Sequence, residues 1–165
     1  MTEAPDEIVV YIEIPRGSRN KYEYDPELDA IVLDRRLFTS TVYPADYGFV
    51  EKTLAEDGDP LDVLVLVGDP TFPGCRIRVR IVAVLRMADE KGPDEKLVCV
   101  PLGDPMWSGV LDVRDIPEAF RAEIDQFFRI YKELEGHPVS TAGFGDRAEA
   151  LAVLTAARAR AAALA

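Results

Sequence analysis

The hydrophobic pattern of this chain changes its period near Pro117, and that change limits the folds that the chain can adopt. Before Pro117 the apolar residues form short runs rich in β-branched side chains, separated by turn sequences such as Pro73-Gly74. The runs cover residues 8–14, 30–38, 61–67, 77–85 and 97–100. Many short strands at this spacing predict a closed β-barrel or a sandwich.

The last third of the chain has helical periodicity. After Pro117, apolar residues recur every three or four positions until Gly136, which predicts one amphipathic helix that ends there. A second helix is expected to begin at Asp146, with Glu149 as its capping-box partner, and to run to about Ala162. The predicted architecture is therefore α+β, with a β-barrel-like core and two C-terminal α-helices.

The charge of the chain restricts its partners. The 165 residues contain 19 Lys and Arg against 30 Asp and Glu, which gives a net charge of −11. Such a chain has no electrostatic footprint for nucleic acid or for an anionic membrane, so we expect neither as a partner. It can instead concentrate divalent cations where its carboxylates converge. Because no repeat or linker divides the sequence, we expect a single domain over residues 1–165.

The compartment is predicted from two features. The N-terminal segment carries Glu3, Asp6 and Glu7 where a signal peptide would carry basic residues, and no apolar stretch approaches the roughly 20 residues that span a bilayer. We therefore expect a cytoplasmic protein. The two cysteines, Cys75 and Cys99, have no metal-binding spacing, and we expect two reduced thiols in or near a core.

The segment D-G-D-P-L-D carries the carboxylates Asp57, Asp59 and Asp62 in front of a run of Leu and Val. Gly58 permits a sharp turn and Pro60 stiffens it, so the three carboxylates can face one point. Asp62 begins an apolar strand, where a carboxylate needs a cation or hydrogen-bond donors. The segment predicts a metal site, although a solvated acidic turn is the alternative. An EF-hand is excluded, because the downstream glutamate and the flanking helices are missing.

A second acidic segment, D-E-K-G-P-D-E-K, carries Asp89, Glu90 and Asp94 between two apolar runs. Taken alone, it has the composition of an ordinary charged hairpin loop. Together with the first segment it favours a shared metal site, because two acidic loops at strand ends can meet at one barrel mouth. Carboxylate oxygens without His or Cys favour Mg²⁺ or Mn²⁺ over zinc.

Cationic and phenolic side chains are interleaved with these acids. They are the donors that a phosphate ligand needs, although each one alone also fits a surface charge or a core tyrosine. The candidates are Lys21, Arg35, Tyr43, Tyr47, Lys96, Tyr131 and Lys132. The sequence has no Walker A loop, Rossmann glycine fingerprint or G-x-S-x-G elbow, which leaves nucleotide-binding folds and serine hydrolases without support.

These motifs resemble those of the soluble family I inorganic pyrophosphatases, and most closely those of the short bacterial, actinobacterial-like members. The likeness extends over nearly the whole chain. Besides D-G-D-P-L-D-V, the matching blocks in family order are I-E-I-P (12–15), N-K-Y-E (20–23), L-D-R (33–35), Y-P-A-D-Y-G-F (43–49), M-A-D-E-K-G-P-D-E-K-L (87–97) and F-F-R-I-Y-K-E-L-E (127–135).

The resemblance implies a role for each matching residue. Asp57, Asp62 and Asp94 correspond to ligands of the tight activating metal, and Asp59 to the general base for the attacking water. Asp89 and Asp94 correspond to the ligands of a third ion. Glu13 and Glu23 correspond to the ligands of an ion that is brought with the substrate. The phosphate-binding groups correspond to Lys21, Arg35, Tyr47, Lys96, Tyr131 and Lys132, and Tyr43 and Glu90 support the site.

The resemblance also implies a five-stranded OB-like closed barrel, several Mg²⁺ ions per site, pyrophosphate as substrate and a homohexamer. One loop departs from the family pattern. Residues 136–140 are Gly-His-Pro-Val-Ser, one residue shorter than in most relatives and without their basic residues. This departure puts in doubt any subsidiary role for basic residues in that loop, and it affects none of the residues named above.

Two other classes of function remain as alternatives. One is an inactive relative retained as a metal-binding or scaffolding protein, which a missing acid or lysine would favour; none of these residues is missing. The other is an OB-type oligonucleotide-binding module, which needs a basic, aromatic-lined face. The acidic loops and the net negative charge oppose this second alternative.

Overall fold

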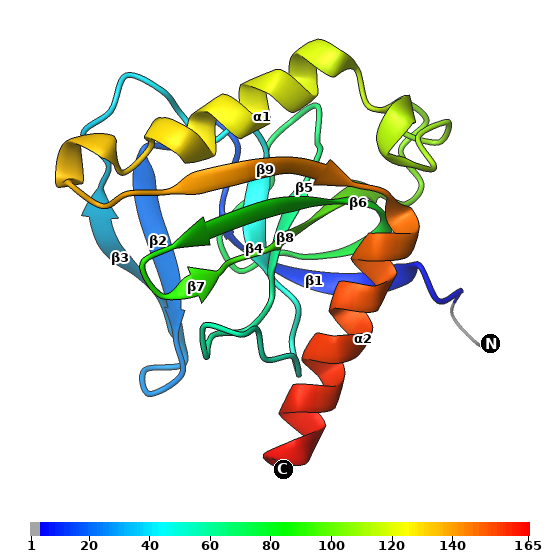
Figure 1. Ribbon diagram of the computed structural model, residues 1–165, viewed down its shortest axis with the longest axis horizontal. Coiled ribbons are helices and arrows are strands. Elements are labelled where there is room, and N and C mark those ends of the chain that lie inside the picture. The colour runs from blue at the N-terminus through cyan, green and yellow to red at the C-terminus, as the bar shows by residue number, and fades with distance from the viewer. Residues whose placement is uncertain (1–3) are drawn as a thin grey trace.

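The computed structural model describes residues 4–165 (Figure 1). Nine strands, two α-helices and two short 3₁₀ helices make up the described part of the chain. In chain order they are β1 (Glu7–Ile14), β2 (Asn20–Asp25), β3 (Ala30–Arg36), β4 (Asp46–Phe49), β5 (Asp62–Val65), β6 (Arg76–Asp89), β7 (Gly92–Pro93), β8 (Lys96–Pro101), η1 (Val113–Asp115), α1 (Glu118–Ile130), η2 (Glu133–Glu135), β9 (Ser140–Gly145) and α2 (Arg147–Ala163).

Strand β1 illustrates how the sequence pattern produces an element. Ile8, Val10, Ile12 and Ile14 are buried, and the residues between them are partly exposed. Successive side chains of a strand point to opposite faces, so one face of β1 enters the core. Glu13 consequently lies on the other face, where it lines a cavity.

Five strands close into a ring. They pair in the order β1, β4, β5, β8 and β6, and β6 pairs back with β1; only the β5–β8 pair is parallel. Strands β7 and β9 extend the sheet from β6, and β2 with β3 forms a separate hairpin. The α+β class is confirmed, and the closed five-stranded ring agrees with the expected barrel.

The two helices cover different parts of the ring (Figure 1). Helix α1 packs its phenylalanines Phe127 and Phe128 into the same cluster as Leu64 and Leu66 of the β5 region. Helix α2 contributes to a second cluster, which contains Val63, Val65, Leu97, Cys99, Ala150, Leu154 and Ala157. The alternation of residues 63–66 between the two clusters makes β5 a strand buried on both faces. Among residues 4–165, no helix has the length and apolar character required to cross a bilayer.

The helix boundaries differ from prediction in two respects. Helix α1 ends at Ile130, and the 3₁₀ turn η2 follows it before Gly136 ends the segment with a left-handed φ of 79°. At the start of α2, the Asp146 side chain accepts a hydrogen bond from the Glu149 backbone at 2.9 Å, as expected for a cap. The Glu149 carboxylate binds Arg86 instead, so only half of the capping box forms.

Strands β4 and β9 were not predicted, and β6 is longer than expected. Strand β9 contains Gly143 and Gly145 and lacks an apolar alternation. It pairs with β6, whose 14 residues extend beyond the predicted range of 77–85 and offer β9 an edge. Strand β4 has only four residues and lies between β1 and β5, so its pairing completes the ring.

Candidate active site

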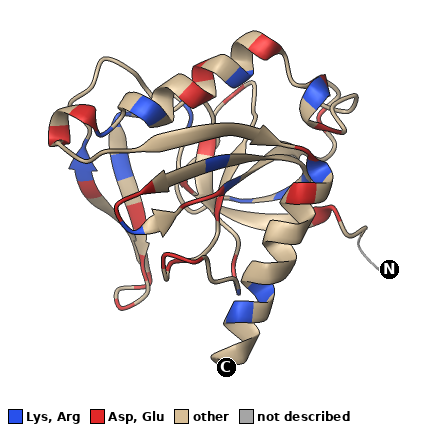
Figure 2. Cartoon of the chain, in the orientation of Figure 1, with Lys and Arg blue, Asp and Glu red and all other residues tan. Residues whose placement is uncertain are grey.

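One cavity of about 580 Å³ collects nearly all of the predicted site residues. It lies where the hairpin β2–β3, the ends of β5 and β8 and the segment after α1 meet, and acidic residues mark the β4–β5 and β6–β7 loops beside it (Figure 2). The predicted residues that line it are Glu13, Lys21, Glu23, Tyr43, Tyr47, Asp57, Asp59, Asp62, Asp89, Asp94, Lys96, Tyr131 and Lys132.

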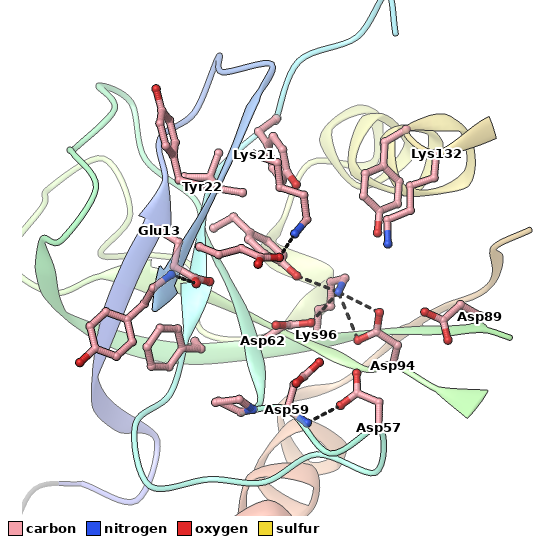
Figure 3. A pocket seen from close by; sticks show the side chains of 18 of the residues that line it. Glu13, Lys21, Tyr22, Asp57, Asp59, Asp62, Asp89, Asp94, Lys96 and Lys132 are labelled. Carbon is pink, nitrogen blue, oxygen red and sulfur yellow. Dashed lines mark hydrogen bonds and ion pairs between the residues drawn. The ribbon is translucent and has the colours of Figure 1, made fainter. Parts of the chain in front are cut away.

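Lys96 lies at the centre of the cavity wall (Figure 3). The parallel register of β5 and β8 places Asp62 beside Lys96. The Lys96 ammonium donates hydrogen bonds to Asp62 Oδ2 at 2.8 Å, to Asp94 Oδ2 at 3.2 Å and to the Tyr47 hydroxyl at 3.0 Å. Only 1% of the lysine is exposed. A single buried cation therefore joins two of the predicted metal ligands.

The surroundings of these groups change their pKa values. Burial lowers the pKa of Lys96, but the carboxylates of Asp62 and Asp94 outweigh this effect and hold the pKa above its usual value. Burial raises the pKa of Asp94, and Lys96 opposes the rise. Burial also raises the pKa of Glu13 to about 7, with a further contribution from the charge of Asp62. The cavity thus contains more carboxylates than its lysines can neutralise.

The turn between β4 and β5 presents Asp57, which is half-buried, and Asp59, which is exposed. Gly58 adopts a left-handed φ of 91°, a conformation that costs glycine little. The Asp59 backbone N–H donates to Asp57 Oδ1 at 3.0 Å, which fixes the turn. Burial raises the pKa of Asp57, whereas the Asp59 side chain stands exposed at the edge of the cavity. The two carboxylates therefore have different surroundings despite their proximity.

The hairpin β2–β3 supplies a second group of charges. Lys21 forms an ion pair with Glu23 and lies 3.7 Å from Asp34. Glu13 accepts a hydrogen bond from the Tyr24 backbone at 2.8 Å, which links β1 to the hairpin. These contacts bring Glu13, Lys21 and Glu23 to one wall of the cavity.

The opposite wall is phenolic. Tyr43 is buried, which raises its pKa, and its ring lies 5.4 Å from that of Tyr47 and 4.7 Å from that of Phe127. Tyr131 packs on the phenylalanines of α1, and the Lys132 ammonium lies 5.1 Å from the centre of the Tyr131 ring. The aromatic packing of α1 thereby holds a tyrosine and a lysine at the cavity.

Two predicted site residues do not line the cavity. Arg35 donates to the Glu135 carboxylate through Nε at 3.1 Å and Nη2 at 2.7 Å, and it also pairs with Asp34. Glu90 lies 3.4 Å from the Nδ1 atom of His137. Both side chains lie near the site and have other partners.

The cavity also contains residues that sequence reasoning missed. Tyr22, Tyr24 and Lys91 line it, and Phe128 places its ring centre 5.3 Å from the Lys96 ammonium. Tyr22 lies inside the N-K-Y-E block (20–23), so its position in that block was an available signal. Tyr24 lies one residue beyond the block. Phe128 was predicted only as part of an apolar helix face, and nothing in its spacing indicated a lysine above it.

The donor set suits a hard divalent cation. Seven acidic side chains line the cavity and offer carboxylate oxygens, which Mg²⁺ and Mn²⁺ prefer. Burial raises the pKa of three of them, Glu13, Asp57 and Asp94. Within residues 4–165, no three acidic, histidine or cysteine side chains are close enough to hold an ion as they stand. The ammonium of Lys96 stands between two of the acids instead.

Comparison with known proteins gives consistent matches. The inorganic pyrophosphatase family profile matches residues 10–162. An inorganic pyrophosphatase of Streptomyces coelicolor is 57% identical over 87% of this chain and 89% of its own length. One from Methanosarcina acetivorans is 52% identical over 97% of this chain and 95% of its own length.

The fold comparison agrees with the sequence comparison. A crystal structure of inorganic pyrophosphatase from Thermus thermophilus superposes with a TM-score of 0.94 at 47% identity, over 98% of this chain and 95% of that chain. The Helicobacter pylori inorganic pyrophosphatase gives a TM-score of 0.94 at 40% identity, over 98% and 96% of the two chains. With a family match over residues 10–162 and relatives above 50% identity, the chain belongs to the inorganic pyrophosphatase family.

Proposed function

We propose that this protein hydrolyses inorganic pyrophosphate to two orthophosphates, with Mg²⁺ as the activating ion and Asp59 as the general base. One observation carries the proposal: carboxylates and lysines from separate strands and loops converge on a single cavity of about 580 Å³. A cavity that offers both kinds of charge suits a substrate that is itself a complex of an anion with divalent cations. The relatives named above as inorganic pyrophosphatases support the same activity.

The acids of the cavity divide into three groups of proposed ligands. Asp57, Asp62 and Asp94 would hold the activating ion, Asp89 with Asp94 a further ion, and Glu13 with Glu23 one that arrives with substrate. Bound Mg²⁺ makes a water molecule more acidic and neutralises part of the phosphate charge, and Mn²⁺ has the same preference for oxygen.

The protein's own groups have complementary roles. Asp59 is exposed at the cavity edge and its backbone is fixed by Asp57, so its carboxylate can accept the proton of the attacking water. The phosphate donors are Lys21, Tyr47, Lys96, Tyr131 and Lys132, which stabilise charge on both the attacked and the leaving phosphate. Arg35 is included with them, because its guanidinium lies at the end of the same hairpin and is 36% exposed. Tyr43 and Glu90 have supporting positions.

We further propose that the protein acts in the cytoplasm as a homohexamer. The exposed apolar side chains of the single chain support the assembly.

Phosphate release from pyrophosphate tests the proposed activity. The purified chain should release two phosphates per pyrophosphate with Mg²⁺ and lose the activity when EDTA removes the metal. A folded, Mg²⁺-binding protein that releases no phosphate would instead favour the inactive metal-binding or scaffolding alternative.

A further inference from the structure

Lys96 is the best-satisfied cation of the cavity. Its ammonium donates to Asp62, to both oxygens of Asp94 and to the Tyr47 hydroxyl, at 2.8 to 3.3 Å. The rings of Tyr47 and Phe128 lie 5.2 and 5.3 Å from the same nitrogen. An ammonium has three protons, so these four contacts use its whole donor capacity.

The two acids that it joins need a counter-ion. The side chains of Asp62 and Asp94 are only 21% and 11% exposed, and they share one wall of the cavity. Two carboxylates so placed repel one another and have lost part of their hydration. A positive charge between them compensates for both effects. Lys96 supplies that charge from a neighbouring strand, because the β5–β8 register pairs it with Asp62.

We infer that Lys96 is a built-in counter-ion of the two acids. Its ammonium pairs with the carboxylates of Asp62 and Asp94 in the metal-free protein, and an incoming divalent cation displaces it from them. The inference rests on the proposed role of these two acids as metal ligands. The lysine donates to Asp62 Oδ2 and to both oxygens of Asp94, so a cation bound to both carboxylates approaches oxygens that the ammonium already contacts. The double charge of that cation repels an ammonium only a few ångströms away. The two cations therefore compete for the same acids.

Displacement gives the ammonium a new partner. Its backbone is held in β8 within the ring, and Tyr47 provides one remaining acceptor. The other two protons then face the space that an anionic substrate enters. Binding of the divalent cation thus changes Lys96 from a partner of carboxylates into a donor for phosphate, and it couples metal binding to anion binding.

The test measures Mg²⁺ affinity without substrate. Isothermal titration of Mg²⁺ into EDTA-stripped protein is performed on the wild type, on Lys96→Met and on Lys91→Met. Lys91 is an exposed lysine that lines the same cavity, so its variant controls for the loss of one positive charge. Lys96→Met should bind Mg²⁺ more tightly by about tenfold, since a like charge beside the ion is removed, whereas Lys91→Met should change affinity by less than about threefold.

Stability of the stripped protein gives a second readout. Lys96→Met should unfold at a lower temperature than the wild type in EDTA, and Mg²⁺ should raise its Tm more than it raises that of the wild type. An unchanged or weaker Mg²⁺ affinity in a folded Lys96→Met variant would overturn the inference.

A measurement on the wild type covers the case in which Lys96→Met does not fold. The ammonium protons of a buried, hydrogen-bonded lysine exchange slowly enough to give a ¹H–¹⁵N signal. Addition of Mg²⁺ should shift or remove the Lys96 signal; an unchanged signal at saturating Mg²⁺ would contradict displacement. Phosphate release by the same wild-type sample separates the two ideas, because a pyrophosphatase whose Lys96 signal does not respond refutes only the counter-ion role.

Discussion

Asp59 and Asp62 are three positions apart, yet they differ in surroundings. The Asp62 carboxylate accepts a hydrogen bond from the buried Lys96 ammonium, whereas Asp59 is exposed on the turn. The Asp62 carboxylate already binds a positive group, the Lys96 ammonium, and is therefore suited to hold a cation. The exposed Asp59 carboxylate can approach a water molecule. Their replacement should therefore have different consequences.

Asp62→Asn should weaken Mg²⁺ activation as well as turnover, because one anionic oxygen ligand is lost, and added Mg²⁺ should restore part of the activity. Asp59→Asn should lower kcat by about 10²–10⁴-fold, as is typical for loss of a general base, without such rescue. The measurement is pyrophosphate hydrolysis against Mg²⁺ concentration for both variants in parallel. Equal rescue of the two variants by Mg²⁺ would show that Asp59 is a ligand instead.

The two thiols should differ in reactivity. Cys99 is fully buried in β8, and burial raises the pKa of its thiol well above the usual range, whereas Cys75 is partly exposed. Because the thiolate is the reactive form, a thiol reagent should label one cysteine per native chain and both cysteines in denaturant. Labelling of Cys99 in the native protein at the rate of Cys75 would contradict the burial seen here.

The predictability of the site depends on how local each contact is. Asp57 and Asp59 lie in one short turn and Asp62 begins β5 directly after it, so their common place at the cavity follows from the segment itself. The Asp62–Lys96 contact depends instead on the parallel register of two strands, which no residue spacing specifies. Arg35 shows the same limit, because its partner Glu135 lies 100 residues away and draws the guanidinium from the cavity lining.

Strand β4 depends on a glycine at its centre. A Cβ atom on Gly48 would lie 2.8 Å from the Tyr11 carbonyl carbon and 2.9 Å from Ile12 Cα, and still closer to the Tyr11 carbonyl oxygen. These are backbone atoms of the neighbouring strand β1, so they cannot move aside without breaking the β1–β4 pairing. Glycine is required here by the close approach of two backbones.

Gly48→Ala should lower the Tm by several degrees or prevent folding, since the ring must open to accept the methyl group. Gly68→Ala is the matched control, because a Cβ atom there meets no heavy atom within 4 Å. Thermal unfolding followed by circular dichroism compares the two variants with the wild type. If Gly48→Ala were as stable as Gly68→Ala, the tight β1–β4 contact would be wrong.

Elements with a strong local signal were predictable, and those defined by their neighbours were not. Strand β1 is a run rich in β-branched residues and α2 begins with a capping aspartate, so both were expected close to their observed bounds. Strand β9 carries two glycines in six residues and forms because β6 offers it an edge. Its pairing is a tertiary interaction, and the local pattern contains no sign of it.

The ring closure explains how distant parts of the sequence form one site. Strands β1, β5 and β8 belong to the same closed sheet, and the loops at their ends meet at the cavity with the segment after α1. The α+β class followed from the change of hydrophobic period, but closure did not, because it requires β6 to pair with both β8 and β1.

The surface of the single chain leads to the last prediction. Phe38, Phe72, Met106 and Leu134 are each at least half exposed, which is unfavourable for large apolar side chains in water. The alanines of α2 do not provide the whole explanation, because Ala150 and Ala157 pack inside the chain. Association that covers such side chains is therefore expected, and we predict six copies from the family resemblance.

Sedimentation velocity at micromolar concentration should give a particle of about six times the 18.3 kDa chain mass. Because apolar burial is largely insensitive to ionic strength, the particle should persist when salt is raised, whereas an assembly held by surface ion pairs would dissociate as those pairs are screened. Serine replacements of Phe38, Phe72 and Leu134, made one at a time, locate the contacts: a side chain inside an interface should shift the equilibrium towards smaller species. A monomer at micromolar concentration, or a hexamer that none of the three replacements affects, would contradict this explanation of the exposed apolar surface.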